Sequence, residues 1–279
     1  MKKLLHWSIL AASHIYLAPN TVFSSGSNTY GTPTWLEQAT YTINDYAAPQ
    51  SDLARSHADG DRWSSQLQSN LLAKYPTINT TRQVNLKDAS VTWSGYRASN
   101  SSGEEMVFFS GHGNTPGMYM QDLKYLYPSD KSYGGWTRWL FISACEVLFN
   151  KDVNWYAPMF AGLHAVFGYE SISYEYIVHE CNVFGCGSYH RSEDVWDVFA
   201  SNWVGQDMFM YDAYVQAVSA TIYKYAGGVA PAAVYLYGQV NGTWLIGGTE
   251  KVWNMFNGDI SWSSLNKTYR YEKYGTPKY

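Results

Sequence analysis

The sequence predicts an α/β fold, a three-layer sandwich in which a mainly parallel sheet carries helices on both faces. Short, continuous apolar runs, typical of buried parallel strands, occupy Met106–Ser110 and Trp139–Ser143. Stretches with helical spacing alternate with such runs through the first two thirds of the chain, which favours β-α-β connections. A chain of 279 residues with 46% hydrophobic and 15% charged residues is also long and apolar enough for one large, ordered domain.

The first part of the chain predicts a strand, a helix and a second strand. Residues 39–47 are rich in β-prone side chains and alternate in polarity, as a half-buried strand does. Residues 52–75 have helical spacing, which we expect to be interrupted at Gly60 and to end at Pro76. Residues 83–97 indicate a further strand or hairpin before the first apolar run.

The second part predicts further α/β units and then a hairpin. Residues 114–135, rich in Gly and Tyr, read as a loop between the two apolar runs. Residues 153–171 indicate a helix and then a strand around Ala165–Tyr169. Helices are expected over 192–204, with acidic residues in its first turn, and over about 206–225. Two β-rich stretches within 232–248, joined across Asn-Gly, predict a hairpin.

The N-terminus resembles a targeting segment. Two lysines precede an apolar stretch at residues 4–18, which is too short for a comfortable membrane span. We therefore expect a signal peptide within 1–25, with a buried N-terminal helix as the alternative. A single domain would then occupy 30–279 and end in an aromatic-rich extension. This organisation predicts a secreted or extracellular protein, periplasmic in a Gram-negative bacterium, without a stable membrane span.

Charge excludes one class of partner. The net charge is −4 and no basic run occurs, so nucleic-acid binding is not expected. The high aromatic content, with 25 Tyr and 12 Trp, is common in secreted proteins rich in loops and strands, but it identifies no ligand. The sequence carries no signal for an oligomeric state.

A reactive side chain follows each of the two apolar runs. His112 follows the first within Ser-Gly-His-Gly, and Cys145 follows the second after Ser-Ala. Ligands of open parallel sheets bind at the carboxyl ends of the strands, so neighbouring strands would place both residues at one edge. A thiolate is a nucleophile and an imidazole exchanges protons at neutral pH, so the pair predicts acyl-transfer chemistry. Taken one at a time, each residue has a non-catalytic interpretation: His112 as a loop histidine bonded to the backbone, and Cys145 as a buried cysteine at a strand end.

The arrangement of hydrophobic strand, His-Gly, spacer, hydrophobic strand and Ala-Cys resembles that of the caspase-like cysteine peptidases. This family includes legumains, gingipains, clostripain, separases and caspases. Here it reads "MVFFSGHG" and then "RWLFISAC", and "ACE" at 144–146 is most similar to the legumain pattern. The resemblance covers residues 104–170, about a quarter of the chain. It also extends to a group of poorly characterised secreted members of that family.

The resemblance implies a caspase-like fold and a secreted cysteine endopeptidase. Cys145 would be the nucleophile, His112 the proton donor to the leaving amine, and Gly113 part of the oxyanion hole. It implies a peptide or protein substrate and neither a cofactor nor a metal at the pair. A catalytically silent binding module and a transpeptidase that uses the same acyl-enzyme are the alternatives.

The resemblance implies that substrate preference is set by a pocket beside the dyad, basic for acidic side chains and acidic for basic ones. Glu146, Glu170 and Arg191 are candidates for such a pocket, with solvated surface or helix-end charges as the simpler interpretation. His164 lies in an apolar stretch that we predict to be helical, so we expect it in the core rather than in the site.

The two other cysteines have three interpretations. Cys181 and Cys186, within "CNVFGC", could form a disulfide on a surface loop away from Cys145. They could remain free thiols. Together with His179 and His190 they could also bind zinc, although the spacing matches no standard zinc finger.

Overall fold

A mixed eight-stranded sheet forms the centre of the protein in its computed structural model, in the order β14-β13-β8-β7-β3-β1-β2 with β15 paired to β13. The structure describes residues 35–76, 79–99, 104–115, 117–133, 137–149, 152–173, 189–223 and 229–240, with the shorter segments 176–178, 181–182, 185–186, 243–246, 250 and 268–273. The predicted signal peptide, residues 1–25, lies outside the described residues.

The sheet is parallel from one edge through its centre. The strands are β1 (Trp35–Thr42), β2 (Asn79–Lys87), β3 (Met106–Ser110), β7 (Trp139–Ser143), β8 (Ala165–Tyr169), β13 (Pro231–Val240), β14 (Thr243–Ile246) and β15 (Thr268–Lys273). Strands β2, β1, β3, β7 and β8 pair in parallel, whereas β13 pairs antiparallel with β8, β14 and β15. The predicted fold class, an α/β sandwich with a mainly parallel sheet, is confirmed.

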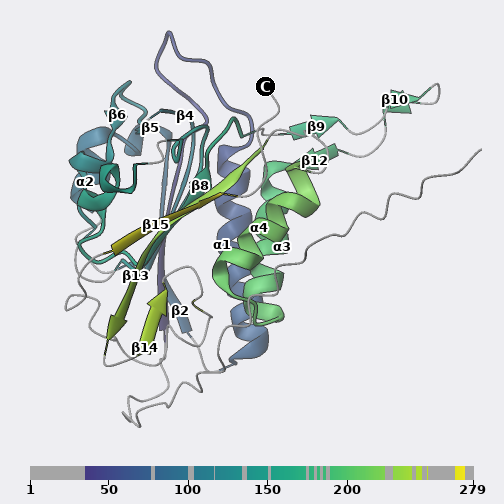
Figure 1. Ribbon diagram of the computed structural model, residues 1–279. Helices are drawn as coiled ribbons and strands as arrows, with labels where there is room; N and C mark the ends of the chain where they lie inside the picture. Colours follow the sequence, from purple (N-terminus) through teal and green to yellow (C-terminus); the bar gives the residue numbers. More distant parts are fainter. Residues whose placement is uncertain are drawn as a thin grey trace, which may run out of the picture.

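The two faces of the sheet are covered differently (Figure 1). Helices α1 (Ser56–Lys74), α3 (Ser192–Ala200) and α4 (Met210–Val218) pack together on one face, and π-helical turns at Ser201–Gly205 and Ser219–Tyr223 follow the last two. The other face carries α2 (Trp93–Ser99), short 3-10 helices and a small sheet of β4 (Gly113–Asn114), β5 (Gly117–Tyr119) and β6 (Tyr125–Leu126). Helices therefore lie on both faces of the sheet. The long helices cover only one face, and the other is covered by short helices and the small sheet.

The two central strands, β3 and β7, are apolar up to their final serines because both of their faces are buried. In β3, Met106 and Phe108 join the core beneath α1, α3 and α4, whereas Val107 and Phe109 join the core on the α2 side. All four side chains are fully buried. Burial on two faces requires the unbroken hydrophobic run from which these strands were predicted.

Gly60 does not interrupt α1, contrary to the prediction. A Cβ atom on Gly60 would lie 2.5 Å from Cγ2 of Thr42, so the missing side chain lets the helix approach β1 closely. A glycine that is unfavourable for an isolated helix is therefore required by the packing of this one. The helix ends at Lys74, before Pro76, as predicted.

Other elements differ from the prediction in their type or bounds. The first strand begins earlier, at Trp35, and ends at Thr42. Residues 83–97 divide between the end of β2, a 3-10 turn at Asp88–Ser90 and α2. The helix expected before β8 consists of two 3-10 turns, Val153–Trp155 and Ala157–Met159, and the helix expected over 206–225 is α4 with its π-helical turn.

Candidate functional site

The ends of β3 and β7 define the candidate site. The two strands are adjacent and parallel, and Ser110 and Ser143, their last residues, are partners in the register. The amide of Gly111 donates to the carbonyl of Ser143 at 3.2 Å, which extends the ladder beyond the strands. His112 and Cys145 each lie two residues beyond these partners. The predicted placement at one edge of the sheet is confirmed.

The loop that follows β1 holds His112. The hydroxyl of Tyr46 accepts a hydrogen bond from the His112 amide at 2.7 Å, and the two rings lie 4.8 Å apart. Nε2 of His112 lies 2.8 Å from the carbonyl oxygen of Ser51. A carbonyl only accepts, so this contact assigns the Nε2 proton to the neutral ring and leaves the lone pair on Nδ1. The imidazole is therefore oriented by backbone, and it remains partly exposed.

A partly exposed carboxylate, that of Asp88, holds the same loop in place. Asp88, in the 3-10 turn after β2, has a φ of 46° and accepts hydrogen bonds from the amides of Asn44 and Asp45 at 2.8 and 3.0 Å. Nε2 of His57 lies 2.9 Å from the same oxygen. Burial acts to raise the pKa of Asp88, but these amides and His57 outweigh it and lower the pKa below its ordinary value.

The loop that follows β8 holds Cys145. Its sulfur lies 3.4 Å from both the amide and the carbonyl oxygen of Ser173. The next residue, Glu146, has a φ of 53° and donates its amide to Ser171. A left-handed conformation is unfavourable for a residue with a side chain, so the chain is strained directly after the cysteine. This sharp turn presents the thiol, which is partly exposed, at the rim of the sheet.

Gly113 lies directly against the backbone of the cysteine turn. A Cβ atom there would lie 2.5 Å from the carbonyl oxygen of Cys145 and 2.7 Å from Cγ1 of Val147. Gly113 is the partner of Met118 in the antiparallel pair β4–β5, and the amide of Tyr119 donates to the carbonyl of His112. This pattern makes Gly113 a non-hydrogen-bonded partner, so its own amide points away from β5. Glycine is thus required here by contact with the cysteine turn.

The sequence did not reveal three residues that contact the pair: Tyr46, Ser51 and Ser173. Each lies in a loop after a strand that neighbours β3 or β7 in the sheet. The signal that identified His112 and Cys145, a position just after a strand end, applies equally to these loops. The sequence alone does not give the order of the strands, so it does not show which loops meet at the site.

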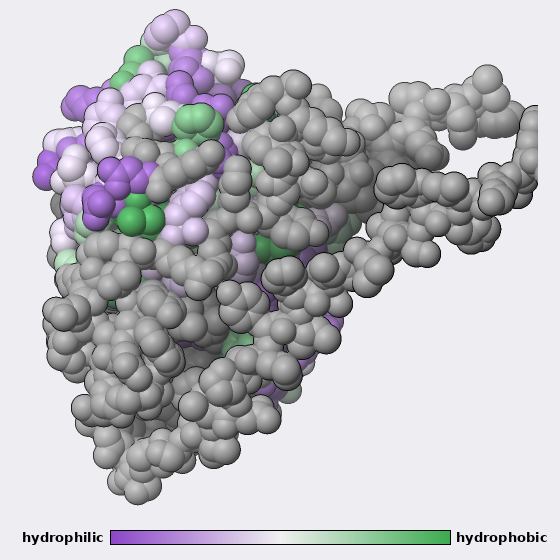
Figure 2. Space-filling view, in the orientation of Figure 1, coloured by the Kyte–Doolittle hydropathy of each residue, from purple (hydrophilic) through white to green (hydrophobic). Residues whose placement is uncertain are grey.

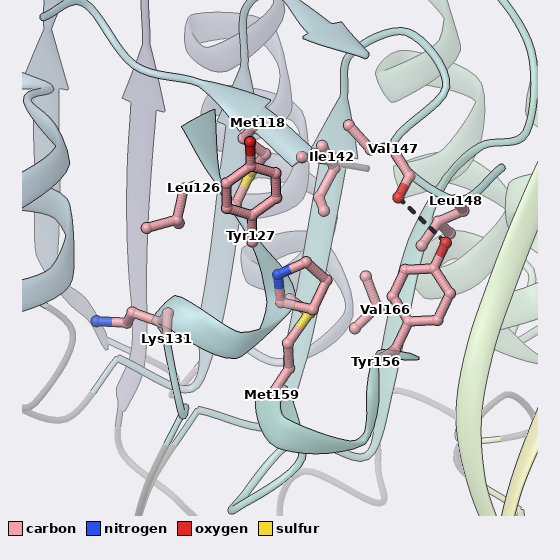
Figure 3. A pocket seen from close by; sticks show the side chains of 12 residues that line it. Met118, Leu126, Tyr127, Lys131, Ile142, Val147, Leu148, Tyr156, Met159 and Val166 are labelled. Atoms are coloured by element: carbon pink, nitrogen blue, oxygen red, sulfur yellow. Dashed lines mark hydrogen bonds between the residues drawn. The ribbon is translucent and has the colours of Figure 1, made fainter. Parts of the chain in front are cut away.

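A small apolar cavity of about 20 Å³ lies beneath the site on the α2 side (Figure 3). Met118, Ile142, Val147 and Met159 are among its lining residues. Val147 also contacts the position that a Gly113 side chain would fill, so the cavity and the site share one wall. This volume accommodates about one water molecule and no substrate side chain.

Lys131 borders this cavity, but its amine points away from the other lining side chains (Figure 3). It donates to the carbonyls of Tyr96 and Arg97 at 3.2 and 2.9 Å. Burial lowers the pKa of Lys131 to about 8. Lys131 therefore satisfies carbonyl groups near the end of α2 and does not contact the candidate site.

The remaining candidate residues lie in different surroundings. His164 is buried, as predicted, although it precedes a strand and bonds through Nδ1 to Glu250 at 2.9 Å. Glu170 is 2% exposed, so its interpretation as a solvated charge was wrong. Glu146 is partly exposed and Arg191 is exposed. None of these positions identifies a specificity pocket.

Cys181 and Cys186 face each other across a short antiparallel ladder. They are register partners in β10 (Cys181–Asn182) and β11 (Gly185–Cys186). Directly opposed residues have Cα atoms about 4.5–5.5 Å apart, within the range of a disulfide. Figure 1 shows β10 far from the ends of the central strands. The side chains of His179 and His190, the other proposed zinc ligands, lie outside the described residues.

Other surface and helix properties give little indication of a ligand. In Figure 2 the described part of the visible surface is mainly hydrophilic, with its hydrophobic residues scattered. No helix within the described segments has both the length and the apolar character needed to cross a bilayer. Among the described side chains, no three His, Cys, Asp or Glu residues gather as metal ligands do.

Comparison with known proteins gives a family and partial similarities to solved structures, two of which follow. Gingipain R, an Arg-specific cysteine proteinase, is 12% identical over 69% of this chain and 43% of its own, with a TM-score of 0.46. The complex of the pro- and mature domains of Porphyromonas gingivalis RgpB is 12% identical over 67% of this chain and 43% of its own, with a TM-score of 0.40.

The matched region thus spans less than half of either known structure, and the similarity concerns the fold alone. No curated protein matches the chain. The model of a family described as a domain of unknown function, DUF6345, matches residues 40–263. The chain therefore belongs to the DUF6345 family.

Proposed function

We propose that this protein is an exported cysteine peptidase in which Cys145 and His112 form the catalytic dyad. The observation that carries the proposal is the register of β3 and β7. Ser110 and Ser143 are opposite each other, and the histidine and the cysteine follow at equal distance along the chain. Gly113 touches the cysteine turn from the histidine side. Export rests on the predicted signal peptide at residues 1–25.

Each group has a role that its contacts support. The thiol of Cys145 gives its proton to Nδ1 of His112, and the sulfur attacks the carbonyl carbon of the scissile bond. The amide of Ser173 beside the sulfur favours its anionic form. The developing oxyanion accepts a hydrogen bond from the Gly113 amide, which β5 does not use. His112 gives a proton to the leaving amine as the C–N bond breaks, which leaves a thioester on Cys145.

The second half of the reaction releases the acyl group. His112 takes a proton from a water molecule while the water oxygen attacks the thioester carbon, and the sulfur leaves as the thiolate. Nδ1 exchanges these protons, because the Ser51 carbonyl retains the proton on Nε2. A second amine in place of water would give transpeptidation through the same intermediate.

The experiment compares wild type with Cys145→Ala and with a control, Ser64→Ala. Ser64 is buried on α1 and contacts Gln38 in the sheet, away from both strand ends. Each protein is incubated with a mixed peptide library in ¹⁸O-labelled water, and products are identified by mass spectrometry. We expect new C-termini that carry ¹⁸O with wild type and Ser64→Ala, and none with Cys145→Ala.

The other outcomes decide between the alternatives. Products joined to a second peptide without ¹⁸O would indicate a transpeptidase. Cleavage that persists in Cys145→Ala would exclude the dyad. Absence of any product from wild type, across sequences and pH values, would favour a catalytically silent binding module.

A further inference from the structure

A buried carboxylate lies beneath the two strand ends that carry the proposed dyad. Asp59, in the first turn of α1, is 3% exposed. Its Oδ2 accepts hydrogen bonds from the hydroxyls of Ser110 at 2.9 Å and Ser143 at 3.0 Å. Its Oδ1 accepts a third from Ser192 at 2.5 Å. These three hydroxyls are buried as well.

The three serines occupy specific positions in the fold. Ser110 and Ser143 are the last residues of β3 and β7, two residues before His112 and Cys145. Ser192 is the first residue of α3. In the sequence it comes after Ser173, the residue that contacts the sulfur of Cys145. The Asp59 carboxylate therefore connects β3, which leads to His112, with β7, which leads to Cys145, and with the first residue of α3.

A second contact joins the same two helix beginnings. Arg55, just before α1, forms an ion pair with Glu193, which is also buried. Helices α1 and α3 are thus joined twice at the edge of the sheet where the site lies. Neither Asp59 nor Glu193 touches the reacting atoms in the proposed chemistry.

A carboxylate is a costly way to fill a core position. Removing its hydration is unfavourable unless hydrogen bonds replace the lost water, and a hydrophobic side chain of similar size would often be as stable. What the carboxylate adds is geometry, because hydrogen bonds to a charged group are short and directional. An amide would offer one acceptor oxygen and an NH₂ group, so it cannot accept all three hydroxyls in the same arrangement.

We propose that Asp59 is a positioning residue that fixes the separation of Cys145 and His112 through Ser110 and Ser143. The inference rests on the proposed function, since it assigns Asp59 a role in aligning that dyad. An error of about 1 Å between reacting groups can cost about 100-fold in rate, so a firm connection between the two strand ends has a direct catalytic consequence.

The test uses Asp59→Asn, the milder Ser143→Ala and the control Ser64→Ala, which changes a buried serine on the same helix as Asp59. Two quantities are measured on the full chain. The first is kcat and KM for a peptide that wild type cleaves. The second is the rate at which iodoacetamide alkylates Cys145 at neutral pH, followed on the Cys145 peptide by mass spectrometry. Thermal unfolding of each variant shows that the protein is folded under the assay conditions.

We expect Asp59→Asn to lower kcat by about 10- to 100-fold with KM changed less than about threefold, as loss of alignment rather than of binding predicts. Alkylation of Cys145 should slow by about 10-fold or more, because the imidazole no longer assists the thiol. Ser143→Ala should lower kcat and slow alkylation as well. Adding Ser143→Ala to Asp59→Asn should have little further effect, because the two changes disrupt the same hydrogen bond.

Two results would overturn the proposal. In the first, folded Asp59→Asn or Ser143→Ala matches Ser64→Ala in both kcat and alkylation rate. In the second, the effects of Asp59→Asn and Ser143→Ala add fully. If Asp59→Asn does not fold, Ser143→Ala decides alone. Failure of the proposed function is distinguishable, because it appears as absence of cleavage by wild type, whereas the alkylation rates still compare the variants.

Discussion

Ser110 and Ser143, 33 residues apart in the chain, are register partners at the ends of adjacent parallel strands and donate to the same oxygen of Asp59. This relationship sets the framework of the candidate site. Beyond it, the chain turns toward the β1 loop at His112 and toward the β8 loop at Cys145. The positions of the His112 and Cys145 side chains therefore depend on two loops that follow the strands on either side, β1 and β8.

Replacing Gly113 by alanine tests the contact between the two halves of the site. The new methyl group would lie 2.5 Å from the Cys145 carbonyl oxygen, so the cysteine turn or β4 has to move. We expect peptide cleavage to fall by about 100-fold, as when an oxyanion donor is lost. The free energy of unfolding should fall by about 1–3 kcal/mol, as at other overpacked sites.

Gly205→Ala is the matched control for this change. The nearest atom to a Cβ there is 3.4 Å away, so the methyl group fits without displacement. Cleavage kinetics and urea denaturation of both variants provide the comparison. Equal behaviour of the two variants would show that the close approach at Gly113 has no role.

The left-handed backbone at Glu146 makes a prediction about stability. At a φ of 53°, a β-branched side chain is more strained than glycine, so Glu146→Val should be less stable than Glu146→Gly by about 1–2 kcal/mol. The free energy of unfolding in urea measures this difference. At Glu37, a partly exposed position in β1, the same pair should show the opposite order because valine favours strands. The same order at both positions would argue against strain after the cysteine.

The lowered pKa of Asp88 predicts a dependence of stability on acid. A carboxyl whose pKa is lower in the folded state stabilises the fold above its ordinary value of 3.8, and this contribution is lost as the pH falls through the folded value. We expect Asp88→Asn to lower the unfolding free energy at neutral pH and to reduce the loss of stability on acidification. Urea denaturation between neutral pH and pH 3 measures both.

Asp61→Asn is the control for that experiment, since its carboxylate contacts Lys87 on the surface and no backbone amide of the β1 loop. It should leave the acid response close to that of wild type. An acid response of Asp88→Asn identical to that of wild type would mean that this carboxylate does not hold the loop that carries Tyr46 and Ser51.

The pairing of Cys181 with Cys186 predicts a disulfide in the oxidised protein. Opposed positions in an antiparallel ladder have Cα atoms close enough for a disulfide. Reduction should increase the intact mass by about 2 Da for one disulfide, and alkylation before reduction should modify Cys145 alone. Modification of all three cysteines without reduction would indicate free thiols, and zinc retained after purification would favour the metal site.

The central sheet could be predicted because its strands carry a local signal. Strands β3 and β7 are apolar up to a final serine because both of their faces are buried, and small residues follow each serine. From these ends the positions of His112, Gly113 and Cys145 follow once the strands are parallel neighbours.

The rest depends on contacts between segments distant in sequence. Gly60 reads as a helix breaker until the approach of α1 to Thr42 is known. Asp59 carries no local signal in the sequence, yet it accepts hydrogen bonds from serines of three other elements. The strand β15 has no pattern of its own and pairs along β13. Such features are set by tertiary packing and leave little trace in local sequence.

The most direct test of the dyad is labelling with a library of thiol-reactive peptidyl probes, applied to wild type, Cys145→Ala and His112→Ala after each is shown to fold by circular dichroism. We predict that the probe attaches to Cys145 in wild type, that Cys145→Ala takes up none, and that labelling of His112→Ala is slower by about 100-fold, the contribution of a positioned proton-transfer group. Labelling of Cys145 at the same rate with and without the His112 imidazole, or no labelling of Cys145 in wild type by any probe, would contradict the account.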